Sequence, residues 1–349
     1  MMITMRSWPK PAPANYHSQN RVIVPVMRHT SLFVWASITM DHSMRSTADK
    51  PVLGILFMIG FCITAPIMDG MAKLTPNEVP VLQIVAARFG VQVVILIPLA
   101  IMMGVAMRPT ARDVVGHLMR GLMLLLATFC FFSAIRYMPI ANAMAIFFVE
   151  PFILTLMGGL LLGEQVGPRR ITACVIGFIG ALFVIQPSFQ ELGFVALLPL
   201  GTAVTFAAYM ILTRTMSDRQ HPIALQAYTA LGASLLILPL IIGFEGTNNP
   251  WLDPVWPSEF AIMALLAVGI LATISHLLLS VALKLAPTAT IAPLQYLEIA
   301  GSVAVGYFLF RDFPDSLTWL GIAIIVGSGL YVFARERRAD LQRRPTPPV

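Results

Sequence analysis

Apolar residues dominate ten stretches of about 20 residues each, and the segments between them carry Pro, Gly, Asn or charged side chains. A helix needs about 20 apolar residues to cross a hydrocarbon core of about 30 Å. The pattern therefore predicts ten membrane-spanning helices, at residues 52–73, 79–103, 114–136, 139–162, 169–187, 191–213, 222–244, 258–283, 287–309 and 317–334.

The composition excludes the main alternatives to a helical membrane protein. Hydrophobic residues make up 57% of the 349 residues and charged residues 11%, whereas a soluble domain has about 25% charged residues. A soluble enzyme and a disordered scaffold are therefore excluded. A membrane β-barrel would alternate apolar and polar positions, which these continuous apolar runs do not.

The basic residues predict the orientation. The net charge is +6, but the basic residues lie at both ends and in short loops, so nucleic-acid binding is not expected. With a cytoplasmic N-terminus, 19 of the 23 Lys and Arg residues fall on the cytoplasmic side, as the positive-inside rule requires. We expect both termini in the cytoplasm, with residues 1–50 and 335–349 as unstructured tails.

The N-terminal tail has an alternative origin. Its apolar stretch from Val22 to Met40 is interrupted by Pro25, Arg28 and His29, so it is a poor spanning segment. Met44 begins a short polar leader directly before the first predicted helix. We therefore hypothesise that residues 1–43 are absent from the native protein, which mass spectrometry of its N-terminus would test.

The chain contains an internal repeat. Residues 134–185 align without a gap on 282–333, which matches Pro139 with Pro287 and Glu150 with Glu298. Each half, 51–187 and 191–334, would hold five helices. Because five is odd, the second half must enter the membrane from the opposite side, the inverted-repeat architecture of many secondary transporters.

Four parts of the sequence resemble a known family. Met138-Pro139 through Glu150-Pro151 to Gly163-Glu164, Pro287 through Glu298 to the last Arg-Glu-Arg-Arg, and the patterns around Asp69 and Arg88 resemble the drug/metabolite transporter superfamily, specifically its ten-helix EamA family. The resemblance covers about residues 52–335. It implies that the fourth and ninth helices cross near the centre and that the fifth and tenth are peripheral.

Family membership implies transport of a small polar or amphiphilic metabolite across a bacterial-type inner membrane, driven by protons or by exchange. The direction stays open: export of amino-acid-like compounds or drugs, or uptake of a cofactor-like metabolite such as S-adenosylmethionine. A distant alternative is a membrane enzyme acting on lipid-linked substrates. No hydrolase, nucleotide-binding or metalloprotease motif is present, so we expect no catalytic residue, metal or cofactor.

Three charged residues are predicted near the middle of the membrane. Arg88 lies about 14 Å from the start of its helix, and Glu150 and Glu298 each lie eleven residues after the equivalent prolines. A charge at this depth needs a partner or a water-filled cavity. We expect a central site in which the glutamates exchange protons and Arg88 binds an anionic group or pairs with a glutamate; a structural Arg–Glu pair is the alternative. Pro151 predicts a helix kink beside Glu150.

Other polar residues are weaker candidates. Asp69 and Lys73 share a helix face, which predicts an intrahelical salt bridge, or else a role in binding substrate or gating the outer mouth. Gln295, Tyr296 and His276 could line the cavity, although such a histidine is more often a structural partner. Glu164 and Asp312 are expected in loop capping or in pairs with arginines. Small residues spaced four apart from Ala173 predict close helix packing, within the monomer or in a homodimer.

Overall fold

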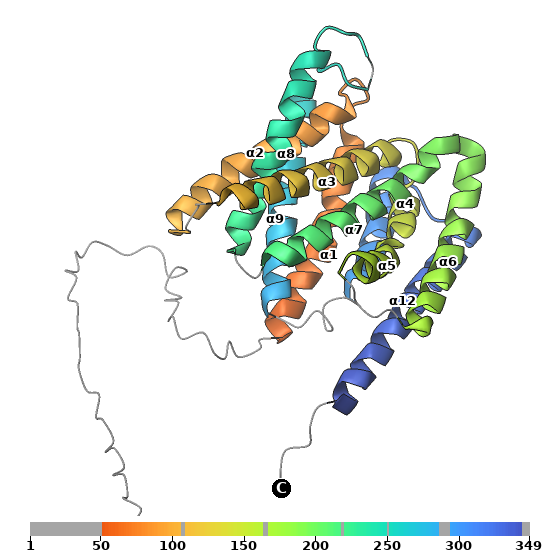
Figure 1. Ribbon diagram of the computed structural model, residues 1–349. Helices are drawn as coiled ribbons and strands as arrows, with labels where there is room; N and C mark the ends of the chain where they lie inside the picture. The colour runs from red at the N-terminus through yellow and green to blue at the C-terminus, as the bar shows by residue number, and fades with distance from the viewer. Residues whose placement is uncertain are drawn as a thin grey trace, which may run out of the picture. The chain divides into compact units, whose positions relative to one another are not determined.

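A computed structural model describes residues 51–105, 109–162, 167–217, 220–249, 251–285 and 294–343, all within the unit Ala48–Val349. Every regular element in these ranges is helical (Figure 1). The helices are α1 (Pro51–Leu74), α2 (Val81–Met102), α3 (Ala111–Ile135), α4 (Ile140–Phe147), α5 (Glu150–Leu162), α6 (Pro168–Leu192), η1 (Gly193–Leu197), α7 (Leu198–Ser217), α8 (Pro222–Phe244), α9 (Glu259–Leu285), α11 (Leu297–Val305), η2 (Gly306–Phe310) and α12 (Ser316–Arg343).

The ten predicted apolar stretches each coincide with helix in the described residues. Seven helical stretches are long and apolar enough to cross a membrane, and three shorter ones, 171–185, 297–310 and 316–331, fall in the remaining predicted stretches. The fold class, an all-α polytopic membrane protein, is confirmed.

The fourth predicted helix is broken at its centre. α4 ends at Phe147 and α5 begins at Glu150, so the predicted kink is confirmed. Pro151 is the second residue of α5. The backbone N–H groups of the first helical turn have no acceptor within the helix, so a proline, which lacks an N–H, loses no hydrogen bond at this position. The break therefore presents Glu150 at the start of a new helix, in the middle of the protein.

Helices of the two halves pack mainly on one another, and the pattern is the same when each helix is exchanged for its counterpart. α1 packs on α9 as α7 packs on α3, and α2 packs on α9 as α8 packs on α3. Three further pairs join counterparts directly: α2 with α8, α4 with α11, and α6 with α12. Two structurally related halves joined by a pseudo-two-fold axis would give this arrangement.

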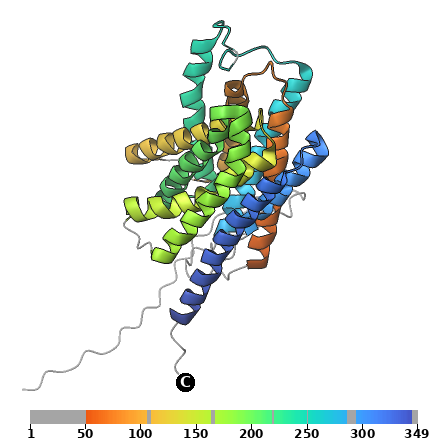
Figure 2. The same cartoon turned by 90° about the vertical axis from the view of Figure 1, so that its right-hand side faces the viewer.

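The pairing of α6 with α12 lies at one edge of the helices, where both views show the two side by side (Figures 1 and 2). A methyl group at Gly321 would come within 2.6 Å of the Gly180 carbonyl oxygen. Gly180 and Gly321 therefore pack closely within one chain. Of the expected run of small residues that starts at Ala173, Gly177 meets Phe152 of α5 rather than α12.

Two expectations meet the structure at the ends of the chain. α12 continues to Arg343, so the prediction that residues 335–349 are wholly unstructured is wrong. Arg, Glu, Ala and Leu in this stretch favour helix. The predicted end at residue 334 was based on hydropathy alone, which does not detect a polar continuation of a helix. Residues 1–50, Glu164 and Pro287 lie outside the described residues.

Candidate functional site

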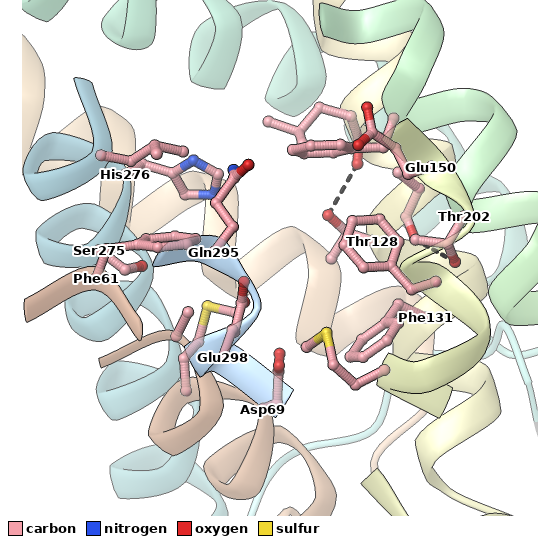
Figure 3. A pocket seen from close by; sticks show the side chains of 18 of the residues that line it. Phe61, Asp69, Thr128, Phe131, Glu150, Thr202, Ser275, His276, Gln295 and Glu298 are labelled. Atoms are coloured by element: carbon pink, nitrogen blue, oxygen red, sulfur yellow. Dashed lines mark hydrogen bonds between the residues drawn. The ribbon is translucent and has the colours of Figure 1, made fainter. Parts of the chain in front are cut away.

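A cavity lies at the centre of the helices, where Arg88, Glu150 and Glu298 were predicted to meet. It leaves about 120 Å³ for the centres of water-sized spheres, which is room for several water molecules, since each needs about 10–15 Å³ by the same measure. Its walls come from α1, α2, α3, α4, α5, α7, α9, α11 and the segment leading into α11. Asp69, Glu298 and His276 lie on one side of it, and Glu150 and Thr128 lie opposite (Figure 3).

Arg88 is 4% exposed and is held by one partner from each half. Its guanidinium donates to the Thr128 hydroxyl on α3 and lies 2.7 Å from Nε2 of His276 on α9. Thr128 and His276 are 148 positions apart, the offset of the repeat, so Arg88 bridges two equivalent positions. The expected pairing of Arg88 with a glutamate is not found among the described residues.

The contact with Arg88 defines the state of His276. A guanidinium has only donors, so Nε2 must accept the hydrogen bond, and the imidazole proton then lies on Nδ1. His276 is therefore a neutral acceptor in this arrangement. If His276 became protonated, it would lose this bond and repel Arg88, which is a direct way for a proton to alter the cationic side of the cavity.

Three carboxyl groups face the same cavity. Asp69 is 3% exposed and Glu298 is 8% exposed, and within the described ranges none of the three carboxyl groups forms an ion pair. Oε1 of Glu150 is buried with no hydrogen-bond partner in the described part of the chain. A buried polar atom without a partner is uncommon and is costly unless a proton or a ligand satisfies it.

Aromatic rings form much of the remaining wall. The ring of Phe147 makes edge-to-face contacts with Phe131, Phe148 and Phe206 at 5.5 to 6.2 Å between centroids. Phe148 in turn stacks at 5.2 Å on Tyr296, its counterpart in the repeat. The cavity thus combines charged groups of both signs with flat apolar surfaces, which suits an amphiphilic molecule with a planar part.

Most predicted site residues meet here. Arg88, Glu150, Glu298, Asp69 and Gln295 line the cavity, whereas Tyr296 contributes by stacking on a lining residue. His276 fits both expectations, because it lines the cavity and also contacts Arg88 on a neighbouring helix. The repeat could have indicated this place for His276, because its offset aligns His276 with another polar residue, Thr128, in the first half.

Lys73 does not belong to the cavity. Its ammonium donates to Asp312 at 2.9 Å and to the Met138 carbonyl at 3.0 Å, and it lies 4.8 Å from the centroid of Phe310. The predicted salt bridge with Asp69 is therefore wrong. Asp69 faces the cavity, whereas Lys73, one turn later at the end of α1, reaches a residue 239 positions away.

No group of three or more His, Cys, Asp or Glu side chains suited to a metal ion occurs among the residues that the structure describes. The cavity offers Arg88 as a cationic contact, three carboxyl groups as anionic contacts or proton acceptors, and aromatic rings for stacking. Such a set can hold a charged organic molecule and move a proton beside it.

These features define a polytopic α-helical membrane protein with a cavity of charged and aromatic residues at the meeting point of two related halves. The chain belongs to the EamA-like transporter family, whose pattern matches residues 52–186 and 193–334. It is a multi-pass membrane protein that transports small metabolites.

Several curated proteins are similar to it over nearly their whole length. A riboflavin transporter of Vibrio cholerae is 24% identical over 86% of this chain and 99% of its own. An S-adenosylmethionine uptake transporter of Rickettsia prowazekii is 24% identical over 82% and 94%. The pseudopaline exporter CntI of Pseudomonas aeruginosa is 26% identical over 78% and 93%.

A solved crystal structure shares the fold. It superposes with a TM-score of 0.56 and 20% sequence identity, over 83% of this chain and 98% of its own. The curated relatives include both uptake and export proteins, so they agree on transport but not on its direction.

Proposed function

We propose that this protein is a secondary transporter of a small amphiphilic metabolite, working by alternating access of its two five-helix halves in a bacterial inner membrane, with both termini in the cytoplasm. The observation that carries the proposal is the central cavity, in which Arg88 faces three carboxyl groups between the two halves. A substrate bound there touches both halves, so their relative movement can present it to either side.

The charges of the cavity support a substrate with a cationic centre, an anionic group and a flat body. Arg88 suits a carboxylate or phosphate. Asp69, Glu150 and Glu298 suit a cation, and the phenylalanine rings suit a planar part. Three acids against one arginine favour a substrate with a net positive charge. This favours a second candidate, uptake of S-adenosylmethionine, which carries a sulfonium cation, a carboxylate and an adenine ring.

Glu150 and Glu298 are the proposed proton-coupling groups. They are equivalent in the repeat, both line the cavity, and Oε1 of Glu150 has no partner among the described residues. A buried carboxyl group favours its neutral form, and a bound cation favours its charged form. Binding of a cationic substrate and release of a proton are thereby linked.

Flux into proteoliposomes tests the proposal, using S-adenosylmethionine, riboflavin and a set of amino acids, with and without a proton gradient. We expect Glu150→Gln and Glu298→Gln to remove the dependence on the gradient. Glu259→Gln, the same substitution at an exposed helix start, should behave as wild type. If both cavity variants keep the wild-type dependence of flux on the proton gradient, the coupling role is refuted. If none of the tested solutes is transported, the proposed substrate class is refuted.

A further inference from the structure

Arg120 on α3 is a buried cation that the central cavity does not use. It is 0% exposed and lies eight residues before Thr128, about 12 Å along the helix. Its guanidinium donates to the Thr213 hydroxyl at 3.1 Å, the Leu225 carbonyl at 3.0 Å and the Tyr209 hydroxyl at 3.2 Å. All three acceptors are neutral, and no carboxylate among the described residues pairs with Arg120.

A chain of polar contacts connects Arg120 with the cavity. The amide of Gln226 on α8 contacts the Tyr209 hydroxyl and the Ser280 hydroxyl, each at 3.4 Å. Ser280 donates to the backbone carbonyl of His276 at 2.7 Å, and His276 lies at the cavity beside Arg88. A row of polar side chains therefore leads from His276 at the cavity to Arg120, toward the N-terminal end of α3.

Arg120 breaks the symmetry of the two halves. With the offset of 148, its counterpart on α9 is Val268, which is also fully buried. Cys130 and Leu278 are equivalent by the same offset, and they contact Gly201 of α7 and Gly60 of α1, respectively. Gly201 and Gly60 are therefore equivalent too. Thr213 and Ala72, each twelve residues further along its helix, then correspond to one another. The two ways out of the cavity thus differ: one holds Arg120 with Thr213, and the other holds Val268 with Ala72.

The partners of Arg120 lie on the other half of the molecule. Arg120 is on α3 of the first half, whereas its three acceptors lie on α7 and α8 of the second half. If the halves move apart at this end, the hydrogen bonds break and the guanidinium faces the opened passage without a counter-charge. Such a cation binds a carboxylate or phosphate strongly.

We propose that Arg120 forms a second anion-binding subsite, which opens on the α3 N-terminal side of the cavity and takes the carboxylate or phosphate group of the substrate after Arg88 releases it. The inference rests on the proposed alternating-access function. The anionic group of the substrate would bind first to Arg88 and then to Arg120, and this second site would exist along one exit only.

Cysteine labelling tests the subsite without knowledge of the substrate. In the full chain with Cys62, Cys130 and Cys174 replaced by serine, Thr213→Cys places a thiol beside Arg120, and the purified protein in nanodiscs is accessible from both sides. The probes are an anionic sulfonatoethyl and a cationic trimethylammonium-ethyl methanethiosulfonate of similar size. We expect the anionic reagent to react faster.

Variants of Arg120 distinguish attraction of the anionic reagent from a structural role of the side chain. Arg120→Gln should lower the ratio of anionic to cationic labelling rates of the thiol at position 213 at least tenfold, whereas Arg120→Lys should keep the preference. Ala72→Cys, at the equivalent position of the other exit, should show a ratio that does not respond to Arg120→Gln. Tyr209→Phe removes a neutral partner and should leave the ratio unchanged.

Two results would overturn the subsite. If the thiol at position 213 does not react in any variant, this passage never opens. If it reacts with the same charge preference in the arginine and glutamine forms, Arg120 only holds helices together. Both results leave the flux assay unaffected, so the failure of the subsite and that of the proposed transport function are distinguishable.

Discussion

The contact between Lys73 and Asp312 should hold one end of the cavity closed. It joins the end of α1 in the first half to the residue pair after η2 in the second half, and Lys73 also binds the Met138 carbonyl. The two side chains are 14% and 31% exposed, so water screens the pair in part. Opening the halves at this end must break the ion pair with Asp312, whereas the hydrogen bond to the Met138 carbonyl lies within the first half.

The expected magnitude follows from the contacts removed. Asp312→Asn removes the ion pair, worth up to about 1 kcal/mol for a partly exposed pair, which shifts an open–closed equilibrium by up to about fivefold. Lys73→Ala also removes the cation–π contact with Phe310 of the second half, so a total of up to about 2 kcal/mol, or up to about 30-fold, is expected.

Labelling of a cavity residue measures the opening. Ala65 lines the cavity and is buried, so Ala65→Cys in a protein without native cysteines should react with a membrane-impermeant thiol reagent only when this end opens. Asp312→Asn should raise the labelling rate up to about fivefold, and Lys73→Ala more. Glu78→Gln, which removes an exposed charge from the neighbouring turn, is the matched control.

A charge reversal decides whether the ion pair itself matters. The double variant Lys73→Asp with Asp312→Lys restores the attraction but lacks the Lys73 ammonium over the Phe310 ring, so its labelling rate should fall below that of either single reversal without reaching wild type. If the double variant is no slower than the single reversals, or if Asp312→Asn equals the Glu78→Gln control, the reasoning is refuted.

Three further outcomes are expected. Gly121→Ala places a methyl group 2.6 Å from backbone of α8 and should destabilise the protein by about 1–3 kcal/mol, seen as a lower Tm, while Gly243→Ala, which has open space around it, should not. His276→Phe removes the hydrogen-bond acceptor of Arg88 and should raise KM for carboxylate-bearing substrates. His276→Gln should leave KM near the wild-type value, because its amide oxygen can accept the same hydrogen bond. An unchanged KM in the phenylalanine variant would contradict the role of His276 in positioning Arg88. Gln83→Ala removes both hydrogen bonds that fix the α8–α9 loop and should speed proteolysis within that loop, with unchanged cleavage contradicting the role.

Segment length was sufficient to predict the helical stretches, and the repeat was sufficient to predict that Glu150 and Glu298 occupy equivalent places. Counting residues from equivalent prolines placed Glu150 and Glu298 at one level, and the structure has both at one cavity. Helix periodicity could not predict partners, because it gives the face of a residue and not the helix opposite. Lys73 shares a face with Asp69, yet its partner lies on a segment 239 residues away, which only tertiary packing determines.

The distribution of charges between the halves connects the fold with the proposed mechanism. A scaffold that alternates between two mirrored states needs equivalent groups in both halves, and the two glutamates meet that need. A substrate is not symmetric, so the residues that recognise it must break the repeat. Asp69, Arg88 and His276 do so, since packing equivalence and the repeat offset place Met210, Ala230 and Thr128 at the corresponding positions. The glutamates are therefore the better candidates for coupling, and the unmatched residues are the better candidates for substrate choice.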